Sequence, residues 1–436
     1  MSVSGASRQR GWYYGWNVVL ATIVSQITAN GLGINSVSLF LRGWARDLHT
    51  PASQLLLAIP ALGAAVAIAS PVMGILADKY PARWLFGLGL AGIATFSLAM
   101  SAVTATWQIW ALYGSLFPIS ITLCTTLVSN AVVSRWFDRR VGLALGLSAV
   151  GVGISGVILP PLIAAVMPDI GWRGVWRAAG LLTGLVVLPL VVWVVRDRPA
   201  AREGSEATNG ENAGRAHHGH GRPVDEGDLR WIDILARRTF WLLVLCFIPI
   251  VGLYFGTLQN LAPIVASHGF DVKTAGMLLA ILALFHVIAT PLLGLVSDRF
   301  GNRLPLAGLA ALALAGAGLV GYGPNLASLA IGVALIGFCG GVWTLIAAAV
   351  VVEFGAGGVG RAFGALLFCL PVNAAAATFI ARTQEATGSY GPALLGLGVF
   401  CLVAAVSALL IHEKRGGHAG PAEREAALED APNPIA

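Results

Sequence analysis

His286 is the residue whose chemical type and position are most unusual in this sequence. It lies at the centre of the apolar run 274–297, whereas the acidic and basic residues fall at the ends of such runs, in loops or in tails, with Glu353 nearest the core. An ionisable group at this depth is costly in lipid and usually marks a substrate or proton pathway. Imidazole titrates near neutral pH, which suits a proton carrier or a switchable partner for a carboxylate. The alternative is a neutral histidine bonded to a carbonyl or a hydroxyl.

Uncharged polar residues in other apolar runs are further candidates for a substrate path. Thr290 lies one helical turn after His286 on the same face, although its hydroxyl could instead bond back to its own helix. The full set predicted to bind substrate is Asn30, Asn35, Tyr254, Gln259, His286, Thr290 and Asn373. We expect Asn30, His286 and Asn373 to matter most, and His286 to couple protons. Any single amide could instead hold two helices together.

Residue patterns for enzymatic or metal chemistry are weak. No Ser/His/Asp set or pair of carboxylates converges, and Gly355–Gly358 does not follow a strand as a nucleotide loop would. The run His217–His220 could bind a divalent metal weakly, but a solvated patch is the better interpretation. The cysteines lie inside apolar runs without pair spacing, which predicts free thiols. We therefore expect no enzyme activity, no cofactor and no metal site.

The composition indicates a membrane protein with many helices. Hydrophobic residues make up 57% of the 436 positions and charged residues only 11%, whereas soluble domains are about 45–50% apolar with glycine counted and about 25% charged. Twelve spans of about 20 residues would use roughly 240 apolar residues. A transmembrane barrel would alternate in polarity, and these runs do not. The net charge of +6 is better explained by membrane topology than by nucleic acid binding.

Twelve apolar runs are long enough to cross a bilayer as helices. They are 16–41, 53–76, 84–104, 107–134, 141–166, 174–195, 239–266, 274–297, 303–322, 326–353, 361–384 and 391–411. The chain thus divides into a six-helix half at 1–196, a polar linker at 197–238, a second half at 239–412 and a polar tail at 413–436. A short interfacial helix is predicted within Leu229–Leu235.

The distribution of lysine and arginine predicts the orientation. They are concentrated in the loops that share a side with both termini and the linker. Because such loops face the cytoplasm, we expect a multi-pass protein of the plasma (inner) membrane with both termini cytoplasmic. The sequence has no obvious dimer signature, so a monomer is the expectation.

A repeated loop is the most specific pattern in the sequence. Its glycine, acidic and basic positions recur in register after the second apolar run of each half. They are Gly74, Asp78 and Arg83 in the first half, and Gly294, Asp298 and Arg303 in the second. Two copies in register indicate an internal pseudo-repeat of the kind found in transporters.

This pattern resembles the major facilitator superfamily, over essentially all twelve runs. The resemblance implies an all-α membrane fold of 12 transmembrane helices in two six-helix pseudo-repeats. It also implies that the repeated loops latch the halves together in the outward-facing state, with Asp78 near Arg361 and Asp298 near Arg140. The alternative is that these residues are only topology-setting loop charges.

Further motifs resemble the monocarboxylate and oxalate–formate transporter branch. They are Gly15-Trp16, Arg135-Trp136-Phe137-Asp138-Arg139-Arg140 before a run containing Gly151, Gly153, Gly156 and Pro160-Pro161, Gly171-Trp172-Arg173, and Thr387-Gly388-Ser389-Tyr390. The charged residues that the best-known relatives use are replaced, for example by Asn35 and His286. The resemblance therefore implies the transport class and leaves lactate or oxalate open.

Together these features predict a secondary active transporter of a small organic acid, a monocarboxylate-like anion. Proton-coupled symport by alternating access is the expected mechanism, with the organic acid, protons and the lipid bilayer as partners. A carrier or exporter of neutral or amphipathic molecules is the alternative, because so little fixed charge lies inside the apolar runs.

Overall fold

The computed structural model describes residues 13–125, 128–129, 132–133, 136, 141–196, 231–367 and 369–411. Every regular element in these ranges is a helix. Helices satisfy all their backbone donors and acceptors within one segment, which is the requirement that a hydrocarbon solvent imposes.

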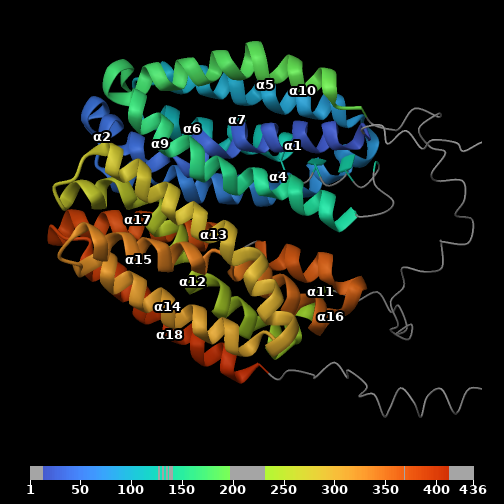
Figure 1. Ribbon diagram of the computed structural model, residues 1–436, viewed down its shortest axis with the longest axis vertical. Helices are drawn as coiled ribbons and strands as arrows, with labels where there is room; N and C mark the ends of the chain where they lie inside the picture. The colour runs from blue at the N-terminus through green and yellow to red at the C-terminus, as the bar shows by residue number, and fades with distance from the viewer. Residues whose placement is uncertain are drawn as a thin grey trace, which may run out of the picture.

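The first part of the chain forms the blue-to-green helices of Figure 1. They are α1 (Gly15–Asn30), η1 (Gly31–Asn35), α2 (Val37–Leu48), α3 (Ala52–Leu55), α4 (Ala58–Lys79), α5 (Ala82–Ser101), α6 (Thr106–Gly114), α7 (Leu116–Cys124), α9 (Val141–Leu182), η2 (Thr183–Val187) and α10 (Leu188–Val194). Here η marks a π-helical segment, which continues the neighbouring α-helix with a wider turn.

The second part forms the yellow-to-red helices, which gather on the other side of the molecule (Figure 1). They are α11 (Trp231–Ala236), α12 (Arg238–Ser267), α13 (Val272–Phe300), α14 (Arg303–Tyr322), α15 (Leu326–Cys339), α16 (Val342–Leu367), α17 (Leu370–Thr387) and α18 (Gly391–Leu410). The short helix α11 falls where the sequence predicts one. We call the two groups the N-terminal and the C-terminal half.

Nine helical segments in the described ranges are long and apolar enough to cross a membrane. One of them, Val150–Val194, covers two of the predicted runs, because the chain turns at Gly171 with φ +67°. That left-handed conformation favours glycine. The predicted run 107–134 is divided between α6, α7 and residues outside the described ranges. The predicted count of twelve therefore stays a prediction.

Several pairs of helices join the two halves. The helix α9 packs against α13, α4 against α17, and α2 against α12. Glycines make the first contact close: a Cβ at Gly153 would lie 2.1 Å from Val287 Cγ2, and one at Gly156 would lie 2.6 Å from Ala283 Cβ. Small residues at this spacing let two helix backbones approach.

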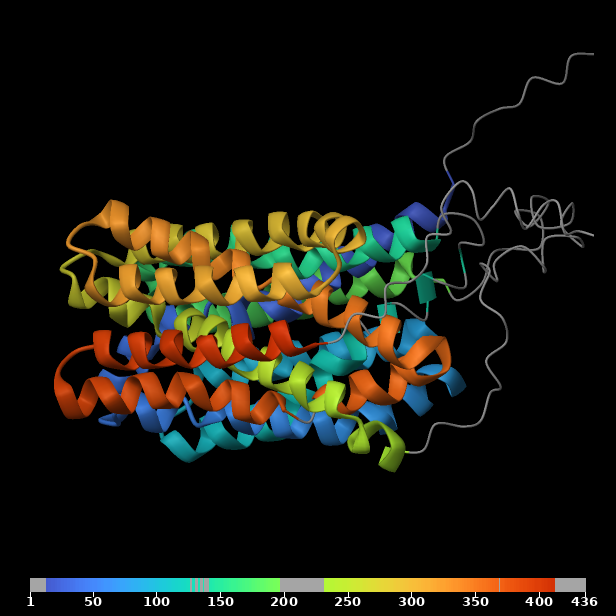
Figure 2. The same cartoon turned by 90° about the horizontal axis from the view of Figure 1, so that it is seen from below.

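The ends of the two halves lie together at one end of the bundle, which we call the linker end (Figure 2). The Tyr14 hydroxyl donates a hydrogen bond to the Val194 carbonyl at 2.8 Å, and the Trp136 indole N–H donates to the Arg196 carbonyl at 2.6 Å. In the other half, the Arg237 guanidinium donates to the Glu353 carbonyl at 3.1 Å.

At the opposite end, which we call the loop end, the Asp47 carboxylate joins segments of the N-terminal half by hydrogen bonds. Asp47 accepts hydrogen bonds from the Trp172 indole N–H at 3.1 Å and from the Arg173 guanidinium, with which it also forms an ion pair. Arg173 donates in addition to the Val103 carbonyl at 3.1 Å. The Gly-Trp-Arg motif therefore ties the turn at Gly171 to α2 and to the end of α5.

Candidate functional site

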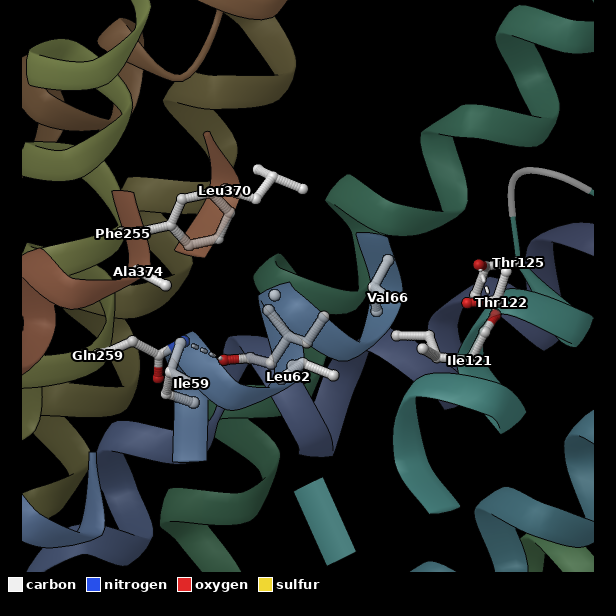
Figure 3. A pocket seen from close by; sticks show the side chains of 12 residues that line it. Ile59, Leu62, Val66, Ile121, Thr122, Thr125, Phe255, Gln259, Leu370 and Ala374 are labelled. Atoms are coloured by element: carbon white, nitrogen blue, oxygen red, sulfur yellow. Dashed lines mark hydrogen bonds between the residues drawn. The ribbon is translucent and has the colours of Figure 1, made fainter. Parts of the chain in front are cut away.

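A cavity of about 290 Å³ lies between the two halves. Its walls come from η1, α4 and α7 on one side and from α12 and α17 on the other, as Figure 3 shows in close-up. The twelve residues that line it are Ile34, Ile59, Leu62, Gly63, Val66, Ile121, Thr122, Thr125, Phe255, Gln259, Leu370 and Ala374. None of these twelve is charged.

Three polar side chains line this cavity. The Gln259 amide donates to the Ile34 carbonyl at 3.2 Å, a hydrogen bond from one half to the other. The hydroxyl of Thr122 donates to the Pro118 carbonyl at 2.7 Å, and that of Thr125 donates to the Ile121 carbonyl at 2.6 Å. Because each hydroxyl donates its hydrogen bond to a carbonyl of its own helix, its oxygen can still accept a hydrogen bond from another group. The cavity can therefore accept a hydrogen bond from a donor group on a largely apolar molecule.

His286 lies inside the C-terminal half and is not among the residues that line this cavity. The Tyr254 hydroxyl on α12 lies 2.9 Å from His286 Nδ1, and the two rings meet edge to face with their centroids 5.2 Å apart. On its other side the imidazole packs against the break between α15 and α16, where a Cβ at Gly340 would lie 2.7 Å from His286 Cγ. Tyr254 and His286, which the sequence analysis names separately as substrate-binding candidates, thus form one hydrogen-bonded unit.

The other predicted residues mostly bond to their own half. The Thr290 hydroxyl donates to the His286 carbonyl at 3.0 Å, and the Asn30 amide donates to the Gln26 carbonyl at 3.0 Å. Asn35 donates to the Ser155 hydroxyl at 2.7 Å and so joins η1 to α9. In this conformation these three side chains satisfy backbone or packing needs, and none of them lines the central cavity.

Asn373 is different from the other amides. It is 1% exposed, and neither its amide nitrogen nor its amide oxygen has a hydrogen-bond partner among the described residues. It lies on α17 between Leu370 and Ala374, which both line the cavity. A buried amide without partners costs free energy, so this one is a candidate for a group that becomes paired in another state or with substrate.

Sequence reasoning missed Thr122 in α7 and Thr125, the residue that follows this helix. Their signal was present, because two hydroxyls three residues apart share one face of a helix in an otherwise apolar run. A threonine inside a helix commonly bonds its own backbone, as these two do, so residue type alone does not indicate a substrate site. Only the position of α7 at the cavity distinguishes them from other such threonines.

The repeated loops are described in part. Asp78 falls in the last turn of α4 and Asp298 in the last turn of α13, so the two copies occupy corresponding places in the halves. The side chains of Asp78, Asp298 and Arg361, and the whole of Arg140, lie outside the described part of the structure, so the predicted pairings of Asp78 with Arg361 and of Asp298 with Arg140 stay predictions. Arg83 and Arg303 are exposed. A Cβ at Gly294 would meet Thr344 at an ordinary 3.6 Å.

Metal-binding groups are not found in the described part of the chain. No cluster of three histidine, cysteine or acidic side chains there could hold an ion. Cys124, Cys246, Cys339, Cys369 and Cys401 are free thiols. The run His217–His220 lies outside the described residues.

Comparison with known proteins identifies the family. The model of the Major Facilitator Superfamily matches residues 22–377 and 255–435. The chain therefore belongs to that superfamily, as the sequence resemblance indicated. It is a multi-pass integral membrane protein of the major facilitator type.

Curated relatives include transporters of several kinds. Human monocarboxylate transporter 11 is 27% identical over 72% of this chain and 63% of its own length. Monocarboxylate transporter 13 of Bos taurus is 30% identical over 47% of this chain and 46% of its own length. The riboflavin transporter RibJ of Trypanosoma brucei brucei is 29% identical over 47% of this chain and 39% of its own length. The chain therefore spans less than two thirds of the length of each of these relatives.

Solved structures share the fold at low identity. A bacterial homologue of the human lysosomal transporter Spinster, described as inward-facing and unoccupied, has a TM-score of 0.67 at 14% identity, over 99% of this chain and 100% of the other. The nucleoside transporter NupG has a TM-score of 0.66 at 11% identity, over 91% of this chain and 98% of the other.

The matches to monocarboxylate transporters agree with the branch that the sequence motifs indicated.

Proposed function

We propose that this protein carries a small organic acid across the membrane together with protons, by alternating access. The observation that carries the proposal is a central cavity walled by both halves, next to an ionisable side chain, His286, inside the C-terminal half. Relatives named as monocarboxylate transporters support the substrate class.

The arrangement of the halves supports alternating access. Side-chain hydrogen bonds join the halves from Gln259 to the Ile34 carbonyl beside the central cavity, and from Ser53 to Glu385 at the loop end. The solved neighbour described as inward-facing has the same fold. Rocking of two halves about a central site would expose the cavity to each side in turn.

The Tyr254–His286 pair supports proton coupling. A neutral imidazole with its proton on Nε2 can accept a hydrogen bond from the tyrosine hydroxyl at Nδ1, and an imidazolium can donate one from Nδ1 to the tyrosine oxygen. The hydrogen bond can therefore persist in both protonation states of His286. The next residue, Val287, contacts α9 of the other half through Gly153, so a change at His286 occurs beside an inter-half contact.

A carrier of neutral or amphipathic molecules is the second candidate. It is favoured by the lining of the cavity, since none of its twelve residues is charged and only three are polar. An organic acid would have to bind here in its protonated, neutral form, or its anion would have to pair with a cationic group that reaches the cavity in another conformation. An unpaired buried charge is very costly.

Flux into proteoliposomes separates the two candidates. The purified protein would be tested with radiolabelled monocarboxylates and with neutral amphipathic compounds such as riboflavin, with and without an inward proton gradient. The proposal expects a monocarboxylate to accumulate only when the gradient is present. Uptake of the neutral compounds alone, unaffected by the gradient, would support the second candidate and contradict the first.

We also propose that the linker end faces the cytoplasm and that the protein is a monomer of the plasma (inner) membrane, with halves at 1–196 and 239–412 joined by the linker 197–238. The excess of lysine and arginine in the corresponding loops supports this orientation. Reporter fusions after Ala436 and at Gly210 should both signal the cytoplasm, and an external signal at either point would contradict it.

A further inference from the structure

The helix α3 begins without a cap from its own sequence. Its N-cap residue is Pro51, which makes no side-chain hydrogen bond to the first turn. The first N–H groups of a helix lack partners inside the helix, and a short polar side chain at the N-cap usually satisfies one of them. Proline has no acceptor in its side chain, so α3 needs an acceptor from elsewhere.

Glu385, near the end of α17 in the other half, supplies that acceptor. The Ser53 backbone N–H donates to Glu385 Oε1 at 2.9 Å, and the Ser53 hydroxyl donates to Glu385 Oε2 at 2.6 Å. Ser53 is 4% exposed. Glu385 is itself exposed, and each of its two carboxylate oxygens accepts one hydrogen bond from Ser53.

The same arrangement occurs inside one half, which gives it a natural reference. Asp271, the N-cap of α13, accepts from the Thr274 backbone N–H at 2.9 Å and from the Thr274 hydroxyl at 2.6 Å. Both carboxylates therefore bind one backbone N–H and one hydroxyl of a first helical turn. The difference is that Asp271 caps its own helix, whereas Glu385 caps a helix of the opposite half.

We propose that Glu385 is a positioning residue for transport that closes the loop end by capping α3 across the two halves. The helix α3 leads directly into α4, and α4 packs along α17, so the loop end cannot separate at these helices while Ser53 holds Glu385. Opening at this end leaves the first turn of α3 without this cap and returns both hydrogen bonds of the exposed Glu385 carboxylate to water. The consequence for transport rests on the alternating access proposed above, but the contact itself does not.

Distances between spin labels test this directly and require no substrate. Labels would be placed at the exposed positions Ala102 and Ser389, in the loops that follow α5 and α17, in full-length protein that carries Cys369→Ser. Loss of one to two hydrogen bonds to a charged group should raise the ratio of open to closed molecules about tenfold in Glu385→Ala. Ser53→Ala, which keeps the backbone bond, should give a smaller rise.

Two further variants distinguish closure of the loop end from general damage. Asp271→Ala removes the matching cap within one half and should leave the label distances unchanged. Pro51→Asp gives α3 a cap of its own, so it should raise the open fraction although Glu385 is intact. Thermal unfolding of each variant shows which of them fold. Unchanged distances in folded Glu385→Ala, or equal shifts in Glu385→Ala and Asp271→Ala, would overturn the proposal while leaving the flux result for the proposed function intact.

Discussion

The hydroxyl of Tyr254 lies 2.9 Å from Nδ1 of His286 and joins α12 to α13 inside the C-terminal half. The imidazole is held from the other side by the backbone at Gly340, where the chain passes from α15 to α16. The ring, carried by α13, therefore contacts α12 and the turn between α15 and α16. A change in the charge or hydrogen bonding of His286 would alter its contacts with these segments.

The contact between Gly153 and Val287 gives a first prediction. Gly153→Ala would place a methyl group 2.1 Å from Val287 Cγ2, and the β-branched valine has little freedom to move away. We expect transport to fall and the free energy of unfolding to drop by about 1–3 kcal/mol. Flux and thermal unfolding in detergent measure both effects.

The double variant Gly153→Ala with Val287→Ala should recover most of the lost transport, because it restores the space. Gly318→Ala is the matched control, since a Cβ there meets nothing within 4 Å. Equal loss of transport in the single and double variants would show that the close approach of α9 and α13 is not the cause.

Much of this fold was predictable from the sequence because hydrophobic segments of membrane length have few alternatives to helices. The repeated loop also predicted corresponding positions for Asp78 and Asp298, which fall in the last turns of α4 and α13. Contacts between residues that lie far apart in the sequence were not predictable. The bond between Glu385 and Ser53 joins residues 332 positions apart, and no local pattern records which carboxylate caps which helix.

The candidate site shows the same limit. His286 stood out because it is ionisable and deep in an apolar run, and its partner Tyr254 was also named. Sequence could not show that Asn35 bonds to Ser155 in its own half, because helical periodicity gives a face and not a neighbour. Thr122 was missed for the same reason.

Asp47 gives a second prediction, at the loop end. The hydrogen bond from Trp172, followed by that from Arg173, lowers the pKa of the Asp47 carboxyl. A lowered pKa means that the ionised form stabilises the fold above about pH 4 and that this contribution is lost as the pH falls through the lowered value. Asp47→Asn should therefore reduce the melting temperature at pH 7, by an amount corresponding to about 1 kcal/mol for this partly exposed group.

The difference between parent and Asp47→Asn should shrink when unfolding is measured at increasingly acidic pH below about 4. Asp169→Asn, which changes an exposed carboxylate before the same turn, serves as the control and should have little effect. A pH-independent difference between parent and Asp47→Asn would argue that packing and not charge is lost.

Thr122 gives a third prediction, for the central cavity. Thr122→Val keeps the shape and removes an acceptor from the lining, so we expect KM for the transported substrate to rise about fivefold with little change in maximal rate. Thr28→Val is matched to it, because the Thr28 hydroxyl also bonds its own helix, to Val24, but Thr28 does not line this cavity. The same KM in Thr122→Val and Thr28→Val would show that Thr122 is not part of the binding site.

The repeated loop gives a fourth prediction. If Asp78 faces the positive end of a neighbouring helix, Asp78→Asn should leave the protein folded but bias the two access states by about 0.3–2 kcal/mol and slow transport. Asp298→Asn should act in the same direction, since it occupies the corresponding place in the other half. Transport equal to the parent at matched expression would leave both residues as topology-setting charges.

His286 carries the central claim, and uphill transport by His286→Gln tests it most directly. Glutamine keeps polarity and approximate size but cannot exchange a proton in the physiological range. In proteoliposomes with an inward proton gradient, the parent should concentrate the organic acid, and His286→Gln should not, while exchange of internal for external substrate should persist. If His286→Gln concentrates the acid as the parent does, the proton travels by another route and the coupling assigned to His286 is contradicted.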